Sequence, residues 1–395
     1  MTEAWLRYGP MDSLAQVSSR LNERFQAFAR QGDTVSAFTV RLPNGKAILV
    51  GHDPSAFVLN VRDRRALSAL VRFDQLALAE AFVGGSLEVE GSLEELLAMR
   101  RFFNDRRLST LPLKFIRPIL FGQTRSDRAF IARHYDEDAE FFETFLDDRH
   151  RCYSHGIFTA PSDTIEDAMT RKMDWAFEAV GLKRGDHVLE VGGGWGAFAA
   201  YAARRGVDVT VLTISGESKK YMDSLMTREG LAANVIMEHL YEFKPHRKYD
   251  AIVAMGVTEH LPNYTKTVRC YERLLRVGGK VYLDAVAMPA KYRLSSFMTR
   301  HIYPGNASPV VLHAYLAAVA RSSFSVECVY NDTEHYWRTC KAWAERLDRA
   351  QETVSSRWGP EQYRKFRLYL RGSVAGFSTG LIQAYRWVLG SKTTA

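Results

Sequence analysis

The segment VLEVGGGWGAF, residues 188–198, is the strongest constraint on the fold of this chain. A short apolar run ends at Val191, glycine occupies four of the next five positions, and an alanine-rich stretch of helical character follows. Glycine permits a tight turn and lets a ligand lie against bare backbone. The pattern therefore predicts a buried strand, a ligand-binding loop and a helix, with the ligand at the carboxyl end of the strand.

Segments of strand and helix character alternate from residue 164 onward. Such alternation is typical of a doubly wound parallel sheet. The expected strands cover residues 187–191, 207–214, 234–237, 249–255 and 280–286, and the expected helices cover residues 164–180, 198–205, 217–229 and 268–275. Residues 311–395 are expected to be mostly helical, with a short strand near residues 324–330.

The first hundred residues have a different pattern. Apolar residues recur at helical spacing over residues 11–30, and two apolar runs flank the turn Pro43-Asn44-Gly45. A further strand is expected at residues 57–61, and short helices at residues 63–72 and 92–104. This part of the chain is therefore expected to form a small α+β unit.

Composition and length exclude several classes of protein. The chain has 395 residues, of which 46% are hydrophobic and 25% charged, so it is long enough for two or three globular domains and is not mainly disordered. It has no run of about 18 apolar residues and no secretory signal at its start. Its four cysteines fit neither a disulfide framework nor a metal-binding pattern. We therefore expect a cytoplasmic protein with no membrane-spanning helix and no metal ligands.

The net charge of +8 is concentrated in one segment. Residues 100–133 contain nine Lys or Arg residues against two Asp, and apolar side chains lie between them. A basic and apolar segment of this kind suits an anionic lipid surface, where each basic residue contributes about 1 kcal/mol. An ordinary interdomain linker with a solvated face is the alternative.

Two nucleotide-containing ligands compete for the glycine loop. A dinucleotide favours the spacing GxGxxG with an acidic residue about 20 positions further on, and the next strand here ends in Leu212-Thr213-Ile214-Ser215 instead. Glu190, Gly192, Gly194 and Gly196 form the pattern E-x-G-x-G-x-G, which is similar to the S-adenosylmethionine loop of Rossmann-like methyltransferases. A structural turn without a ligand is the remaining alternative.

Several segments together resemble one family, the cyclopropane-fatty-acyl-phospholipid synthases, which include the related mycolic acid methyltransferases. The resemblance runs nearly end to end. It is carried by HYDEDAEFFETFLDDRHRCYSHGIF (134–158), VLEVGGGWGAF (188–198), VTVLTIS (209–215), AMGVTEHLPNY (254–264), RHIYPGNASP (300–309) and HYWRTCKAW (335–343). It implies a lipid-binding-like α+β domain over residues 1–105, a basic linker over 106–130 and a Rossmann-like S-adenosylmethionine methyltransferase domain over 131–395.

The resemblance also implies a reaction. The methyl group of S-adenosylmethionine is transferred to the double bond of an unsaturated fatty acyl chain of a phospholipid, through a carbocation that a base then deprotonates. A C-methylated or methylenated chain is the product expected first, a cyclopropane ring is the second outcome, and a catalytically silent lipid-binding homologue is the alternative from another class. Unsaturated phospholipids and an anionic membrane surface are the expected partners, with the protein peripheral at the inner membrane surface. Homo-oligomer formation is left open. Nucleic acid is not expected, because no Asn/Asp-Pro-Pro-Tyr-type segment follows the fourth strand.

In the family, the base is a bicarbonate ion held by Cys, Glu, His, a backbone group and Tyr. Glu259, Tyr336 and the backbone of Val286 match this pattern, whereas His155 stands in place of the Cys and Asp284 in place of the His. An anionic Asp284 beside Glu259 would repel bicarbonate unless one carboxyl stays protonated. Either the two replacements hold bicarbonate through a mutual hydrogen bond, or they join Glu259 in a proton-accepting group of their own.

The family pattern assigns the remaining site residues. His134 opens the methyltransferase domain and is expected at the active site. Tyr153 and Ser154 are expected to contact the methionine part of the cofactor. The full set expected to bind the cofactor is Tyr153, Ser154, Glu190, Gly192, Gly194, Gly196, Thr213, Ile214, Tyr241 and Met255.

Overall fold

The computed structural model describes residues 14–32, 35–105, 124, 138–303 and 307–392. These residues belong to two units. The first comprises residues 1–109, 295–297 and 351–379, and the second comprises residues 110–294, 298–350 and 380–395. The expected linker, residues 106–130, lies outside the described residues except for Thr124. Residues 351–379 belong to the first unit, which differs from the expected continuous domain over residues 131–395.

The first unit contains a four-stranded sheet in the order β2-β1-β3-β4. Its strands are β1 (Phe38–Arg41), β2 (Ala47–Val50), β3 (Phe57–Val61) and β4 (Leu87–Gly91), and its helices are α1 (Leu14–Arg30), α2 (Arg64–Val71), α3 (Gln75–Val83) and α4 (Leu93–Ala98). Helix α1 buries Val17, Leu21, Phe25 and Phe28, as its apolar spacing predicts. The sequence prediction omitted α3 and β4, and the expected helix over residues 92–104 is the shorter α4 followed by a 3₁₀ turn.

Two helices from the end of the chain complete the first unit. They are α14 (Gln351–Trp358) and α15 (Pro360–Ser378). Helix α15 packs against α3 and α4, and Arg371 forms an ion pair with Glu94. Local sequence patterns do not show that the chain returns to the first unit, because this return depends on contacts between residues almost 280 positions apart.

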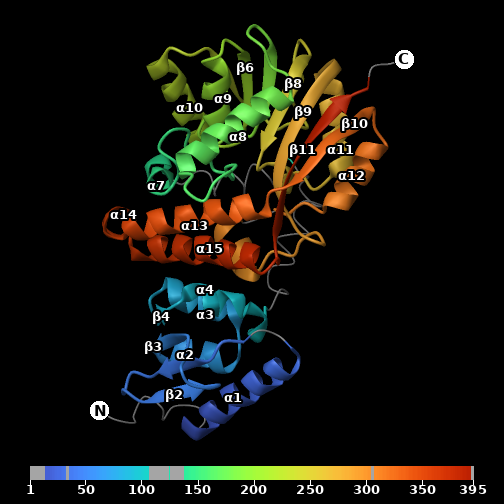
Figure 1. Cartoon of the computed structure of the whole chain (residues 1–395). Coiled ribbons are helices and arrows are strands. Elements are labelled where there is room, and N and C mark those ends of the chain that lie inside the picture. The colour runs from blue at the N-terminus through green and yellow to red at the C-terminus, as the bar shows by residue number, and fades with distance from the viewer. Residues whose placement is uncertain (1–13, 33–34, 106–123, 125–137, 304–306, 393–395) are drawn as a thin grey trace. The chain divides into compact units, whose positions relative to one another are not determined.

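The second unit is built on a seven-stranded sheet in the order β10-β11-β9-β8-β5-β6-β7 (Figure 1). Its strands are β5 (His187–Val191), β6 (Asp208–Thr213), β7 (Ala233–Met237), β8 (Tyr249–Met255), β9 (Leu275–Ala287), β10 (Phe324–Asn331) and β11 (Gln383–Ser391). Strand β11 is antiparallel to both of its neighbours, and the strands from β9 to β7 are parallel. This arrangement confirms the expected Rossmann-like α/β class.

Helices cover the sheet of the second unit. They are α7 (Ala139–Glu143), α8 (Ile165–Ala179), α9 (Ala197–Ala203), α10 (Gly216–Glu229), α11 (Tyr264–Leu274), α12 (Leu312–Ala320) and α13 (Thr333–Arg349). The core includes the fully buried side chains of Leu189, Ile252, Leu283 and Trp387 from adjacent strands. Among the residues that the structure describes, no helix is both long and apolar enough to cross a membrane.

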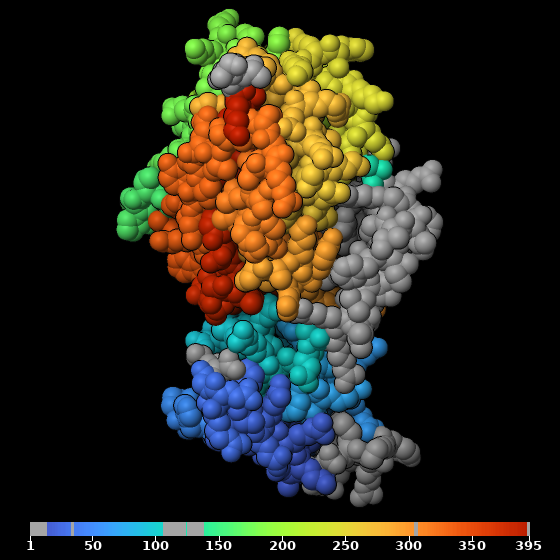
Figure 2. Space-filling view, turned by 90° about the vertical axis from the view of Figure 1, so that its right-hand side faces the viewer, coloured from blue at the N-terminus to red at the C-terminus, as the bar shows by residue number. Residues whose placement is uncertain are grey.

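Strand β11 was not predicted from the sequence. It lies between β9 and β10, and in the space-filling view its red atoms lie between the orange atoms of flanking segments (Figure 2). Five consecutive residues, Arg386 to Gly390, are buried. A strand buried on both faces lacks the alternation of apolar and polar residues that marks a half-exposed strand, so periodicity does not separate it from a buried helix.

Candidate active site

The glycine loop follows β5, as the sequence predicts. Gly192 has φ +76°, and a Cβ atom on it would lie 2.3 Å from Cγ2 of Val257, in the loop after β8. Gly194 has φ +52°, and a Cβ atom there would meet no atom within 4 Å. Gly192 is therefore required both by its backbone conformation and by close packing, whereas Gly194 borders open space.

A pocket lies at the carboxyl ends of β5, β6 and β8, where a doubly wound sheet binds its ligand. Eight of the ten residues expected to bind the cofactor line it: Tyr153, Ser154, Glu190, Gly192, Gly194, Thr213, Ile214 and Met255. Polar or aromatic lining residues that were not expected include Arg151, Trp195, Ser218, Glu238, His239 and His260. Glu238 directly follows β7, so its place at the carboxyl end of a strand was the signal that could have found it.

Two of the expected cofactor residues have other surroundings and are not among the lining residues of this pocket. Gly196 precedes α9, and a Cβ atom on it would lie 3.1 Å from Cγ of Met222 in α10. The Tyr241 hydroxyl lies 2.9 Å from Oγ1 of Thr267, and the Lys266 ammonium lies 4.2 Å from the centre of the Tyr241 ring. Gly196 therefore serves close helix packing.

Glu190 provides a test of whether the pocket fits a hydrogen-bonding, cationic ligand. Its side chain is buried at the end of β5, and its Oε2 has no hydrogen-bond partner among the described residues. Burial raises the pKa of this carboxyl to about 8. A buried carboxyl oxygen without a partner is costly, and a ligand that donates a hydrogen bond or brings a positive charge would satisfy it. The residues present therefore fit S-adenosylmethionine, which has hydrogen-bond donors and a positive charge.

Glu259 lies in a 3₁₀ turn, residues Thr258–His260, beside the pocket. Its Oε1 accepts a hydrogen bond of 2.7 Å from the backbone N–H of Val286, and its buried Oε2 has no partner in the described part of the chain. Burial raises the pKa of Glu259 to about 7, although the hydrogen bond from Val286 acts in the opposite direction. A carboxyl group in this state can accept a proton near neutral pH.

The structure does not join His155 to Asp284. His155 Nε2 lies 2.8 Å from Oδ2 of Asp332, and Oδ1 of Asp332 accepts a hydrogen bond of 2.7 Å from Arg386. Asp284 is paired with Lys172 instead, at 2.9 Å. This corrects the alternative in which a His155–Asp284 hydrogen bond holds bicarbonate, because the two residues face different elements: His155 faces the residue before α13, and Asp284 faces α8.

The other expected catalytic residues are placed as follows. The Tyr336 ring in α13 lies 5.0 Å from the His155 ring, centre to centre. His134 lies outside the described residues. Part of the donor set expected for a bicarbonate ion is already used, because the Val286 N–H bonds Glu259, His155 Nε2 bonds Asp332 and Asp284 is paired with Lys172. His155 Nδ1 is buried and has no partner among the described residues.

Lys172 and Asp332 are two further site residues that the sequence analysis missed. The buried face of α8 contains Ile165, Ala168, Met169, Lys172, Met173 and Ala176. A lysine on the apolar stripe of an amphipathic helix was the available signal, since lysine is almost never fully buried without a partner. Asp332 had no such signal, because it comes from a segment 177 residues away from His155.

The sheet order, the glycine loop at the end of β5 and the pocket beside it define a Rossmann-like S-adenosylmethionine-dependent methyltransferase. The sequence model of one family, mycolic acid cyclopropane synthetase, matches residues 122–387. The chain belongs to this family.

Relatives of known name agree with this assignment. The chain is 26% identical to a probable fatty acid methyltransferase of Pseudomonas putida, over 88% of this chain and 90% of that protein. It is 27% identical to the tuberculostearic acid methyltransferase UfaA1 of Mycobacterium tuberculosis, over 66% of this chain and 65% of that protein. It is 22% identical to a sphingolipid C9-methyltransferase of Candida albicans, over 78% of this chain and 64% of that protein.

Solved structures show the same fold and identify the cofactor. The cyclopropane synthase MmaA2 of Mycobacterium tuberculosis superposes with a TM-score of 0.62 at 25% identity, covering 67% of this chain and 98% of that one. The mycolic acid cyclopropane synthase CmaA1, in complex with SAH and CTAB, gives the same values. SAH is the demethylated product of S-adenosylmethionine, so S-adenosylmethionine is the cofactor of this chain.

Replacing Gly192 by alanine is expected to weaken S-adenosylmethionine binding at least about tenfold. The added methyl group would overlap Val257 and displace the loop against which the ligand lies. A displacement of about 1 Å in a site can lower a reaction rate up to about 100-fold, and we expect ligand affinity to be sensitive to it as well. Calorimetric titration with S-adenosylmethionine measures the effect. Gly181→Ala is the matched control, because Gly181 has φ +70° and open space around it. Equal affinity of the two variants would contradict the assigned role of Gly192.

Proposed function

We propose that this chain transfers the methyl group of S-adenosylmethionine to the double bond of an unsaturated fatty acyl chain of a phospholipid. The observation that carries the proposal is the buried Glu259 carboxyl beside the cofactor pocket, whose Oε2 has no partner among the described residues and whose pKa is about 7. Membership of the cyclopropane synthase family and the fatty acid methyltransferase relative that matches over nine tenths of its length support a lipid acyl substrate.

The proposed reaction has two steps. S-adenosylmethionine supplies an electrophilic methyl group when it is bound. In the first step, the electron pair of the acyl double bond forms the new carbon–carbon bond, the methyl–sulfur bond breaks, and a carbocation remains on the neighbouring chain carbon. An alkene is a weak nucleophile, so the walls of the site contribute mainly by positioning it in line with the methyl group.

In the second step, Oε2 of Glu259 removes a proton from a carbon next to the cation. The electron pair of that C–H bond becomes a new double bond, which gives a C-methylated alkene. A methylenated chain forms if a hydride first shifts from the methyl-bearing carbon to the cation, because the proton next to the cation can then come from the new methyl group. The Val286 N–H holds the other carboxyl oxygen and thereby fixes the direction of Oε2. Without that shift, removal of a proton from the new methyl group would instead close a cyclopropane ring, as the electron pair of the methyl C–H bond forms a bond to the cationic carbon. The two cyclopropane synthases among the similar structures favour this second candidate.

Product analysis tests the proposal. The protein would be incubated with methyl-labelled S-adenosylmethionine and vesicles of an unsaturated phospholipid, with vesicles of the saturated phospholipid as the control. We expect label only in the unsaturated acyl chains, in a product that still reacts with ozone. Ring and alkene products have the same mass, so ozone reactivity separates them. An ozone-resistant ring as the sole product would support the second candidate, and no labelled lipid would contradict both.

We further propose that the chain acts at an anionic membrane surface, on the basis of the charge of residues 100–133. Replacing the four arginines Arg106, Arg107, Arg125 and Arg128 by glutamine is expected to weaken binding to anionic vesicles at least tenfold at low salt, because each basic residue near such a surface contributes about 1 kcal/mol. Co-sedimentation with anionic and neutral vesicles measures the change. Unchanged binding to anionic vesicles would contradict this localisation.

A further inference from the structure

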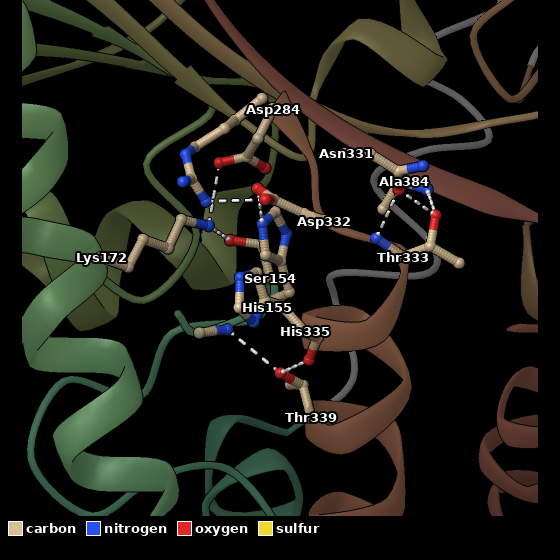
Figure 3. A network of polar contacts seen from close by, with 12 residues as sticks. Ser154, His155, Lys172, Asp284, Asn331, Asp332, Thr333, His335, Thr339 and Ala384 are labelled. Atoms are coloured by element: carbon tan, nitrogen blue, oxygen red, sulfur yellow. Dashed lines mark hydrogen bonds and ion pairs between the residues drawn. The ribbon is translucent and has the colours of Figure 1, made fainter. Parts of the chain in front are cut away.

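Lys172 is a fully buried lysine in the middle of α8. Its Nζ lies 2.9 Å from Oδ2 of Asp284, and neither side chain has any exposed area. The same ammonium donates a hydrogen bond to Oγ of Ser154. Figure 3 shows the side chain reaching from its helix toward Ser154 and Asp284.

Asp284 continues this set of contacts on the side of the sheet. Its Oδ1 accepts a hydrogen bond of 3.0 Å from the backbone N–H of Gly256, and its Oδ2 accepts one of 3.0 Å from the hydroxyl of Tyr282. Both carboxylate oxygens are therefore used. Gly256 directly follows β8 and has φ +65°, and its N–H also donates a hydrogen bond of 3.1 Å to the backbone carbonyl of Asp284, so the side chain of Asp284 adds a second acceptor to this N–H.

The two residues at the ends of this set form part of the cofactor pocket. Ser154 and Gly256 both line it. They are also close to each other, because a Cβ atom on Gly256 would lie 3.6 Å from Cβ of Ser154. The buried ion pair thus connects two pocket-lining segments that are about 100 residues apart in the sequence.

Stability alone does not account for this ion pair. Removing two charges from water costs several kcal/mol per ion, and apolar residues of similar volume are often as stabilising as a buried pair or more so. The flanking residues of α8 on the same face, Met169 and Met173, show that apolar side chains pack well there. An apolar pair could not supply the side-chain contacts to Ser154, to the Gly256 N–H and to the Tyr282 hydroxyl, and the first two of these reach the cofactor pocket.

We propose that Lys172 and Asp284 are a positioning pair for the cofactor: together they fix Ser154 and the Gly256 peptide in the orientation that binds S-adenosylmethionine. The proposal rests on the cofactor site of the proposed function and is independent of the lipid substrate. One alternative from the sequence placed Asp284 in a hydrogen bond with His155 that holds a bicarbonate ion. In this role it acts through Gly256 instead.

The pair also affects the proposed base. The negative charge of Asp284 raises the pKa of Glu259 and the positive charge of Lys172 lowers it. His260 neighbours Glu259 on the same turn, and the pKa of Tyr264 in α11 is raised in part by the charge of Glu259. Removing both members of the pair therefore removes one charge that raises the pKa of Glu259 and one that lowers it. The affinity for S-adenosylmethionine can be measured separately from the pKa of Glu259.

Two variants test the proposal. Lys172→Met removes the ammonium and leaves Asp284 without its cation, so we expect a loss of thermal stability together with weaker S-adenosylmethionine binding. Lys172→Met/Asp284→Asn contains no unpaired buried charge, so we expect most of the thermal stability to return. Its affinity for S-adenosylmethionine, measured by calorimetry, is expected to stay at least about tenfold weaker, because Ser154 has lost the charge-assisted hydrogen bond from Lys172.

The test depends on whether the affinity for S-adenosylmethionine recovers together with the thermal stability in the double variant. If the double variant binds S-adenosylmethionine as tightly as the parent chain, the pair is merely structural and the proposal is wrong. If Lys172→Met does not fold, the double variant alone gives the answer. Lys280→Met is the matched control, because Lys280 forms a half-exposed pair with Glu327 on β9 and β10, and it is expected to leave the affinity unchanged. None of these measurements needs a lipid, so failure of the lipid assay would leave them intact.

Discussion

Replacing Glu259 by glutamine is expected to lower kcat for methyl transfer to unsaturated phospholipid by about 10²- to 10⁴-fold, the usual contribution of a positioned general base. Glutamine keeps the shape of the side chain and an oxygen that can accept the hydrogen bond from Val286. It has no basic oxygen at neutral pH, so the proton of the carbocation would have no acceptor at this place. S-adenosylmethionine binding should change little, because Glu259 is not a lining residue of the cofactor pocket.

The pH dependence gives an independent check of Glu259. The working form is the carboxylate, and burial holds its pKa at about 7. The rate of the parent chain should therefore rise as the pH increases through 7, and the residual rate of Glu259→Gln should lack this rise. Glu272→Gln is the control, because Glu272 is a surface carboxylate that bonds Ser323. A Glu259→Gln variant that keeps more than about a tenth of kcat would show that another group is the base.

Local patterns were enough to predict the parts of the fold that carry the cofactor. The glycine loop and the strands at residues 187–191 and 249–255 were predicted within their observed bounds. Each depends on contiguous residues: an apolar run for a strand buried on both faces, and glycines where the backbone requires positive φ. The apolar spacing of residues 14–30 predicted α1 for the same reason.

The partners of the site residues could not be predicted from local patterns. The family resemblance pointed to His155 and Asp284, and the natural assumption was that an imidazole and a carboxyl that replace two neighbouring groups would bond each other. The structure gives each of them a different partner, Asp332 and Lys172. Contacts between segments more than 100 residues apart depend on the packing of α8, β9 and α13, and one sequence contains no direct record of them.

The ion pair with Lys172 explains how an aspartate, Asp284, can occupy a position where the family has a histidine. An unpaired carboxylate beside Glu259 would be strongly unfavourable, and this was the difficulty the sequence raised. The Lys172 ammonium neutralises it, and the Tyr282 hydroxyl and Gly256 N–H complete its hydrogen bonds. The aspartate at this position therefore has a buried counter-ion in this chain.

Replacing Asp332 by alanine is expected to lower the free energy of unfolding by about 3–5 kcal/mol, the usual cost of removing one partner of a buried ion pair. Asp332 is 1% exposed and accepts hydrogen bonds from both Arg386 and His155. The substitution would leave the Arg386 guanidinium buried against the rings of Trp175 and Tyr330 without an anion. It would also leave the His155 ring, which is fully buried, without the acceptor that orients it.

The dependence on pH and a surface control make this prediction specific. Burial raises the pKa of Asp332, but the hydrogen bond and charge of His155 and the charge of Arg386 outweigh it, so the pKa lies below its ordinary value of 3.8. The stabilisation is therefore fully present above pH 3.8 and is lost as the pH falls through the folded-state pKa. Urea unfolding should show a constant difference in the free energy of unfolding between the parent chain and Asp332→Ala at neutral pH, and a smaller difference in acid.

Asp223→Ala is the control. It removes a half-exposed carboxylate paired with Lys219, and should lower the free energy of unfolding by at most about 1 kcal/mol. Similar losses for the two variants would mean that the His155–Asp332–Arg386 set contributes no more than a surface ion pair.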